Sequence, residues 1–211
     1  MIKLSEPRDI GDYISELFAE RWRHHDRAIL RHTLIGMVGG QVVNARSLSS
    51  KYSIPESKVS AALATDRYDL NSSGDVIDVF GVSISGRLPF DFRAQESTLN
   101  ICCALVSVMI SQLTPGQNTN LSVDPVSKSP IKVISGPSGA TSYPNGAVIV
   151  LVAPSIDEFC QDQWNSFCKY VRFYESEENA SSGSRQASPA VQLSVQELSG
   201  VAQSLSDTLW P

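Results

Sequence analysis

The chain has 211 residues, of which 42% are hydrophobic, and this is enough for one large domain or two small ones. Its 22 acidic and 17 basic residues give a net charge of −5 with no basic block, which argues against nucleic-acid binding by phosphate neutralisation. No apolar run reaches the ~18 residues of a transmembrane helix. The polar N-terminus lacks the order of a signal peptide, so we expect a cytoplasmic protein without membrane contact, whose thiols stay reduced.

Residues 1–88 favour an N-terminal helix followed by a winged-helix module. Apolar residues recur at helical spacing over residues 11–38, which predicts one long helix. Asn44 can cap a short helix, and Pro55 suits the start of another across a tight turn. Two alternating stretches joined by a Ser-Ser-Gly turn then predict a hairpin, the wing. Because the helix that would enter a DNA groove carries only Lys58 as a basic residue, we favour a packing role over DNA binding.

Residues 89–211 predict a second domain of mixed short strands and helices. Its expected helices cover about residues 99–113, 156–167 and 194–209, and its expected strands cover 120–124, 131–135, 147–152 and 169–174. The acidic, serine-rich stretch at about 175–189 is typical of a loop or linker. The expected fold class is therefore α+β, with the N-terminal helix and the winged helix-turn-helix packed on the mixed domain and a cleft between them.

The four cysteines carry the strongest chemical signal. They are Cys102, Cys103, Cys160 and Cys168, and no CxxC pair or Cys/His finger is present, so a structural zinc site is not expected. On the expected helix, Cys103 and Ser107 share a face, whereas Cys102 points about a quarter turn away. Two thiols from distant segments that met in an apolar pocket would suit a soft ion such as Hg(II) or Cu(I). The alternative is that these cysteines are ordinary buried residues.

The chain resembles the organomercurial lyases (alkylmercury lyases) from about residue 28 to its end. The resemblance is carried, in chain order, by the segments ARSLSSKYSIPESKVSAAL, DLNSSGDVIDVFGVSIS, CCALVSVMISQL, AVIVLVAP and SFCKYVRFY. The family's tryptophan-cysteine-alanine-leucine-aspartate run matches residues 102–106, and its serine-phenylalanine-cysteine step matches residues 166–168. The resemblance implies that Cys103 is the attacking thiolate and a metal ligand, and that Cys168 is the second ligand and a candidate proton carrier.

The resemblance also implies a reaction and its partners. The expected substrate is a small organomercurial, whose carbon–mercury bond is cleaved to a hydrocarbon and Hg(II). Cellular thiols or a mercuric reductase would collect the Hg(II), no organic cofactor would be needed, and we expect the protein to be a monomer.

Three positions depart from the family pattern. The family's catalytic aspartate falls on Val106, a further cysteine of its strand region falls on Asp124, and its tryptophan falls on Cys102. Ser107, one turn after Cys103, and Asp124 are therefore candidates to handle the proton, and Cys102 is a candidate third sulfur ligand.

Three interpretations stay open at this point. The chain is a lyase in which another group than the aspartate supplies the proton, or it binds a soft metal such as Hg(II) or Cu(I) without cleaving a bond, or the fold has been reused for another role. The first is our prediction. Release of a hydrocarbon distinguishes it from the second.

Overall fold

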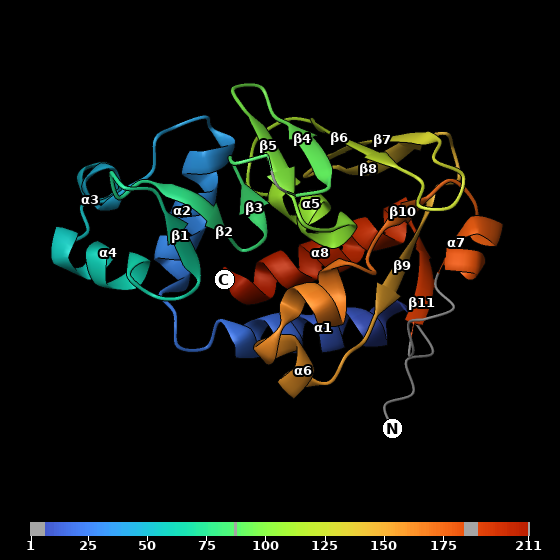
Figure 1. Ribbon diagram of the computed structural model, residues 1–211, viewed down its shortest axis with the longest axis horizontal. Helices are drawn as coiled ribbons and strands as arrows, with labels where there is room; N and C mark the ends of the chain where they lie inside the picture. Colours follow the sequence, from blue (N-terminus) through green and yellow to red (C-terminus); the bar gives the residue numbers. More distant parts are fainter. Residues whose placement is uncertain (1–6, 87, 184–189, 211) are drawn as a thin grey trace.

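The computed structural model describes residues 7–86, 88–183 and 190–210, and these form an α+β fold (Figure 1). Its α-helices are α1 (Pro7–Arg21), α2 (Arg27–Val38), α3 (Ala45–Tyr52), α4 (Glu56–Leu63), α5 (Ala104–Ser111), α6 (Ile156–Gln161), α7 (Glu177–Gly183) and α8 (Val195–Leu209). Its strands are β1 (Tyr68–Leu70), β2 (Val76–Val79), β3 (Val82–Ser83), β4 (Phe90–Arg93), β5 (Thr98–Ile101), β6 (Asn118–Val123), β7 (Pro130–Gly136), β8 (Gly139–Tyr143), β9 (Val148–Val152), β10 (Phe173–Tyr174) and β11 (Ala190–Ser194). A short π-helix spans Trp164–Cys168.

The strands form two antiparallel sheets. The larger sheet has the order β1-β2-β3-β5-β4-β6-β7-β8, and the smaller has the order β10-β9-β11. Every residue of β9 is buried, which explains its unbroken apolar run, since a central strand covered on both faces shows no alternation. None of the helices within the described ranges is long and apolar enough to cross a bilayer.

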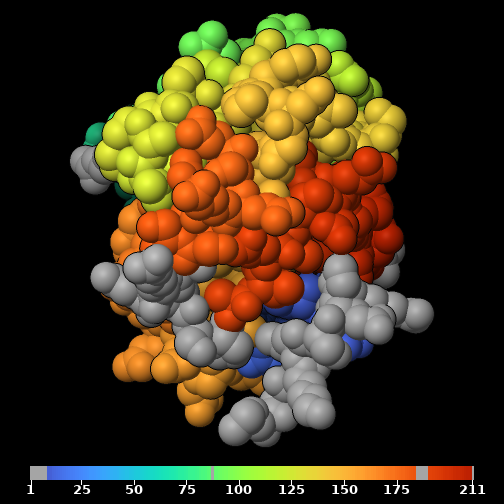
Figure 2. Space-filling model, turned by 90° about the vertical axis from the view of Figure 1, so that its right-hand side faces the viewer, coloured from blue at the N-terminus to red at the C-terminus, as the bar shows by residue number. Residues whose placement is uncertain are grey.

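Helix α8 lies between the large sheet and α1 (Figure 1). The Ser194 hydroxyl accepts a hydrogen bond from the Glu197 backbone N–H, and the Glu197 carboxylate accepts one from the Ser194 N–H, so the helix begins with a capping box. Its apolar residues recur every three or four positions and are buried, namely Val195, Leu198, Val201, Ala202, Leu205 and Leu209. The predicted helix over 194–209 is confirmed. Seen from the side, the red C-terminal segments lie between the yellow strands and the blue α1 (Figure 2).

The N-terminal region contains two helices where the sequence predicted one over residues 11–38. Helix α1 ends at Arg21, and α2 begins at Arg27 because the Asp26 carboxylate accepts hydrogen bonds from the Ala28 and Ile29 backbone N–H groups. Helical spacing on both sides concealed this break.

The predicted helix-turn-helix and hairpin are found at the expected positions. Asn44 caps α3 in a capping box with Ser47, α4 follows Pro55, and β1 and β2 form the hairpin. The Lys58 ammonium lies 2.8 Å from the Asp26 carboxylate, so the one basic residue of α4 is engaged within the fold. The assignment of these elements as a winged helix stays a prediction.

The large sheet continues across residue 88, where the sequence analysis divides the chain. Strand β3 pairs with β5, with Val82 opposite Ile101, and α1 packs against α8. The elements on either side of the division thus share hydrogen bonds and core, and the division into two domains stays a prediction.

The predicted helix over residues 99–113 was wrong in its first turn. Residues 98–101 form β5, which hydrogen-bonds to β3 and β4 on its two sides, and the helix α5 covers only Ala104–Ser111. All eight residues of α5 are buried. No polar residue marks the point between residues 101 and 104 where the buried strand ends and the buried helix begins. The periodicity of the sequence therefore could not place the boundary between β5 and α5.

Three further elements differ from the prediction. The helix expected over 156–167 is α6, which ends at Gln161, followed by the π-helix; its predicted cap, Ser155, is confirmed as half of a capping box with Glu158. Only residues 173–174 of the expected strand 169–174 pair, in β10. The expected loop at 175–189 contains α7, and its residues 184–189 lie outside the described ranges.

Candidate functional site

The two adjacent cysteines lie at the junction of β5 and α5. Cys103 is the N-cap of α5 with an extended backbone (φ −154°, ψ 165°). The Cys102 backbone N–H donates to the Gly81 carbonyl at 2.8 Å, and the Ala104 N–H donates to the Val171 carbonyl at 3.0 Å. The junction is therefore held on one side by the β2–β3 turn and on the other by the segment that follows the π-helix.

The structure brings Cys102, Cys103 and Cys168 together. Their sulfur atoms all lie within 4.8 Å of one another, and the Sγ atoms of Cys102 and Cys168 are 3.1 Å apart. The three residues are at most 3% exposed. The prediction that Cys102 points away from Cys103 was wrong, because neither residue lies inside the helix and an extended N-cap allows both thiols to reach Cys168.

Cys168 is held at the end of the π-helix by aromatic packing. The preceding residue, Phe167, is fully buried and packs edge-on against Phe18 and Phe159. The Gln163 side-chain amide lies 3.5 Å from the Cys168 sulfur and donates to it. A π-bulge at a functional position is a common feature of proteins, and here it sets the direction of the Cys168 side chain.

The electrostatics of the cluster favour one thiolate and two thiols. Burial would raise the pKa of Cys103, but the Cys102 and Cys168 thiols, the Val106 backbone N–H and the Arg172 charge lower that pKa well below its ordinary value. Burial and the Cys103 thiolate raise the pKa of Cys102. The Cys102 thiol lowers the pKa of Cys168, but Cys103 and burial raise it further. Of the three sulfurs, Cys103 is therefore the one whose thiolate form is favoured, and the thiolate is the reactive form of cysteine.

The cluster has the dimensions of a soft-metal site. With a metal–sulfur bond of about 2.3 Å, as for zinc thiolates, two opposed ligands lie about 4.6 Å apart and three ligands around one ion about 4.0 Å apart. All the sulfur separations fall within 4.8 Å, but the Cys102 and Cys168 sulfurs, 3.1 Å apart, would have to separate by about 1 Å to share an ion. Sulfur-only donors in a dry environment select soft ions over hard ones.

Gly81 is required by the close approach of the β2–β3 turn to Cys102. Its backbone has a φ of +75°, and a Cβ atom built on it would lie 2.3 Å from the Cys102 sulfur and 3.0 Å from the Cys102 Cβ. Both the left-handed conformation and the lack of space exclude a side chain here.

A small polar pocket beside β1 and β2 borders two residues that contact the thiol cluster. Its volume is about 180 Å³, and its walls include Gly81, which touches Cys102, and Gln163, which touches Cys168. The other lining residues are Arg21, Trp22, Asp66, Arg67, Asp69, Asp78 and Phe80. We call this cavity the thiol-side pocket.

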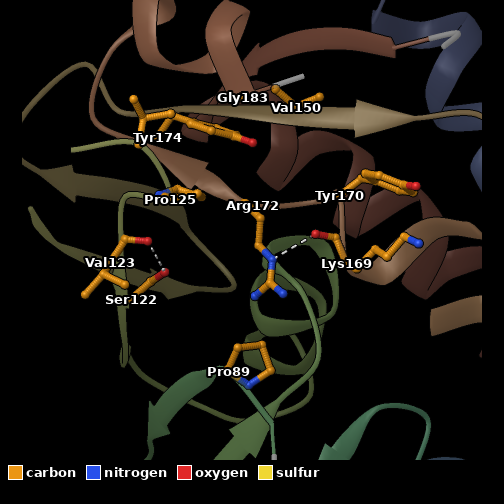
Figure 3. A pocket seen from close by; sticks show the side chains of 11 residues that line it. Pro89, Ser122, Val123, Pro125, Val150, Lys169, Tyr170, Arg172, Tyr174 and Gly183 are labelled. Carbon is orange, nitrogen blue, oxygen red and sulfur yellow. Dashed lines mark hydrogen bonds between the residues drawn. The ribbon is translucent and has the colours of Figure 1, made fainter. Parts of the chain in front are cut away.

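A larger cavity of about 480 Å³ is lined by residues of β6, β9 and β10 and of the segment that follows the π-helix (Figure 3). Arg172 extends into it, with its Nε donating to the Lys169 carbonyl at 3.1 Å (Figure 3). The Arg172 charge that lowers the Cys103 pKa therefore lies in the wall of this larger cavity.

The two candidate proton-handling residues are engaged in other hydrogen bonds. The Ser107 hydroxyl donates to the Ala104 carbonyl at 2.8 Å and is fully buried in α5. The Asp124 carboxylate is also buried and accepts from the Val126, Ser127 and Glu175 backbone N–H groups and from the Asn179 side chain. The cluster of thiols that could hold a metal does not include Asp124.

The sequence analysis missed three residues at this site, namely Gly81, Gln163 and Arg172. Gly81 lies inside the predicted hairpin, and its Phe-Gly step marked only a turn. Gln163 and Arg172 flank Cys168 at five and four residues, but no spacing rule assigns such polar residues to a sulfur site. Cys160 lies in α6, is partly buried and remains outside the cluster.

Comparisons with known proteins give a consistent result. A family model described as alkylmercury lyase matches residues 86–207, more than half of the chain. A solved structure, the "Crystal structure of the mercury-bound form of MerB2", superposes with a TM-score of 0.73 at 17% sequence identity, over 94% of this chain and 99% of that chain. No curated protein sequence matches the chain.

Proposed function

Because the chain belongs to the alkylmercury lyase family, we propose that it cleaves the carbon–mercury bond of a small organomercurial. The observation that carries this proposal is the meeting of three buried thiols from two distant segments within 4.8 Å, one of them with a lowered pKa. A buried group of ordinary packing cysteines has no reason to hold a thiolate, because burial alone disfavours the charged form.

Cys103 begins the reaction. Its thiolate attacks mercury in R–Hg–SR′, where R′S is the thiol that carries the organomercurial, and the carrier leaves as R′S⁻. Cys168 and Cys102 then add as further sulfur ligands and release their protons. Each added thiolate increases the electron density on mercury and hence on the bound carbon.

Cleavage completes the reaction. The carbon–mercury bond breaks, its electron pair stays with the carbon, and the carbon takes a proton to become the hydrocarbon RH. Mercury remains as Hg(II) on the cysteine sulfurs until external thiols or a reductase remove it by ligand exchange. No organic cofactor takes part.

A second function is favoured by one specific observation. Val106 stands at the family's aspartate position, and its buried side chain can neither donate nor accept a proton. A protein with the thiols but without an acid would bind Hg(II) or the organomercurial and would not cleave it.

One experiment distinguishes the two functions. The reduced protein is incubated with phenylmercury and excess thiol, and benzene release is measured for the wild type, C103S and C168S, with C160S as the matched control outside the cluster. The lyase predicts release by the wild type and C160S and loss of release in C103S and C168S. Stoichiometric phenylmercury binding without benzene would favour the second function.

A further inference from the structure

The thiol-side pocket is lined by a pair of carboxyl groups as well as by Gly81 and Gln163, the two wall residues that contact the cysteines. Asp69 on β1 and Asp78 on β2 are directly opposite each other in the antiparallel ladder, and both line the pocket. Residues opposite each other have Cβ atoms about 4.5–5.5 Å apart and side chains on the same face. Two carboxylates at this separation repel, and the more buried of the two retains its proton more easily.

Burial distinguishes the two groups. Asp69 is exposed, whereas Asp78 is partly buried between β1 and β3. Burial raises the pKa of Asp78 to about 6; the Ser83 hydroxyl lowers that pKa by less, and Asp69 raises it further. Asp78 therefore carries a proton for part of the time near neutral pH.

No basic side chain in the described ranges pairs with Asp78. Arg21, from α1, donates to the Phe159 and Cys160 carbonyls, and Arg67 lies 3.8 Å from Asp66. The charged residues of the pocket wall are Arg21, Asp66, Arg67, Asp69 and Asp78. Arg21 is thus directed at other acceptors, the Arg67 Nε donates no hydrogen bond, and the proton on Asp78 is not displaced by an ion pair.

The pocket links this carboxyl to the reacting atoms. A ligand that fills about 180 Å³ beside Gly81 and Gln163 touches the walls that contact Cys102 and Cys168, and it shares the same space with Asp78. No cysteine lines the pocket itself, so we place the organic group of a bound organomercurial in the free volume beside Gly81 and Gln163.

We propose that Asp78 is the acid that protonates the carbon released from mercury and so takes the place of the aspartate that Val106 replaces. This inference rests on the proposed function. The carbon–mercury bond breaks, the carbon receives the electron pair and the Asp78 proton, directly or through one water molecule, and Hg(II) stays on the sulfurs. The Asp78 carboxylate is then reprotonated from solvent or by a thiol that binds the next mercury.

The test is a single turnover of bound phenylmercury. The reduced wild type, D78N, D78E and D91N are each loaded with one equivalent, and benzene release is followed between pH 5 and 8. Asp91 is an exposed carboxylate on β4 of the same sheet, outside the pocket, and serves as the matched control. A positioned general acid contributes about 100-fold or more.

The expected result is that D78N binds phenylmercury as the wild type does and releases benzene about 100-fold more slowly. D78E should regain part of the rate, and D91N should match the wild type. The wild-type rate should fall as the pH rises above about 6, where Asp78 loses its proton, and the D78N rate should lack this dependence.

Other outcomes overturn the inference in distinguishable ways. Benzene release by D78N at the wild-type rate would mean that the Cys102 or Cys168 thiol supplies the proton. Loss of phenylmercury binding in both D78N and D78E would assign Asp78 a structural role. No benzene from the wild type would remove the proposed function together with the inference.

Discussion

The contact between Gly81 and Cys102 makes Gly81→Ala the sharpest test of the site's architecture. Alanine at a φ of +75° costs about 1–2 kcal/mol in backbone strain. The new Cβ would lie 2.3 Å from the Cys102 sulfur, so the turn or the thiol must move, and overpacking of this kind costs about 1–3 kcal/mol more. G81A should therefore lower the free energy of unfolding by about 2–5 kcal/mol and displace one sulfur of the cluster.

Gly74 provides the matched control, because its φ of +81° is similar and no atom lies within 4 Å of the position of its Cβ. G74A should show the strain alone, about 1–2 kcal/mol. The difference between the two variants isolates the contact with Cys102.

Urea denaturation of G81A, C102A and the double variant G81A/C102A measures the coupling between the two positions. Removal of the Cys102 sulfur should relieve much of the steric part of the G81A effect, so the double variant should be more stable than the sum of the single effects predicts. A G81A variant no less stable than G74A, or additive effects in the cycle, would refute the packing of Cys102 against this turn.

Three further measurements follow from the charges. D124N should lose about 2–3 kcal/mol of stability at pH 7, because an amide cannot accept all four hydrogen bonds that the Asp124 carboxylate accepts. Burial raises the Asp124 pKa but these bonds lower it overall, so the wild-type advantage should shrink as the pH falls below 3.8, as urea denaturation across pH would show. The pKa of Asp78 is raised from 3.8 to about 6, so the stability linked to its proton is complete below pH 3.8 and is lost as the pH rises through 6. At pH 7.5, D78N should therefore be more stable than the wild type by about 1–2 kcal/mol, after allowance for solvent screening. Near pH 4 the two proteins should be equally stable. R172Q should raise the pKa of the Cys103 thiol, which ultraviolet thiolate absorbance detects as a midpoint at higher pH, and the change should vanish in C103S.

Local signals placed many elements of the fold correctly. Caps at Asn44 and Ser155 were predicted from short-range hydrogen-bonding rules, and the structure contains both as capping boxes, with a third at Ser194 that was not predicted. The elements that the sequence misplaced depend on distant partners. Strand β5 exists because β3 and β4 pair with it on both sides, and no residue between 98 and 101 records that pairing.

The site was predicted only in part, because its assembly also depends on contacts between segments that are distant in the sequence. The sequence, through its family resemblance, singled out Cys103 and Cys168, and the structure places them together. It named Cys102 as a candidate third ligand but misjudged the direction of its side chain, because that direction depends on where α5 begins. It gave no signal for Asp78 either, since an acidic residue in a hairpin reads as a solvent-facing position until the pocket and Asp69 are seen beside it.

Two of the departures from the family pattern are linked by the chemistry of protons. By the resemblance, Cys102 falls on the family's tryptophan and Val106 on its aspartate, so on this matching the junction gains one ionisable group and loses another. The gained thiol lies among the sulfurs, where it holds its proton until a metal displaces it. In the proposed reaction, that proton is released by the same step that strengthens electron donation to mercury, so it would be available when the carbon leaves. A carboxyl with a pKa of about 6 in the adjoining pocket can accept the proton from the thiol and pass it to the carbon. On this account C102S should slow benzene release less than D78N does, because serine removes one proton source and the carboxyl still takes protons from solvent.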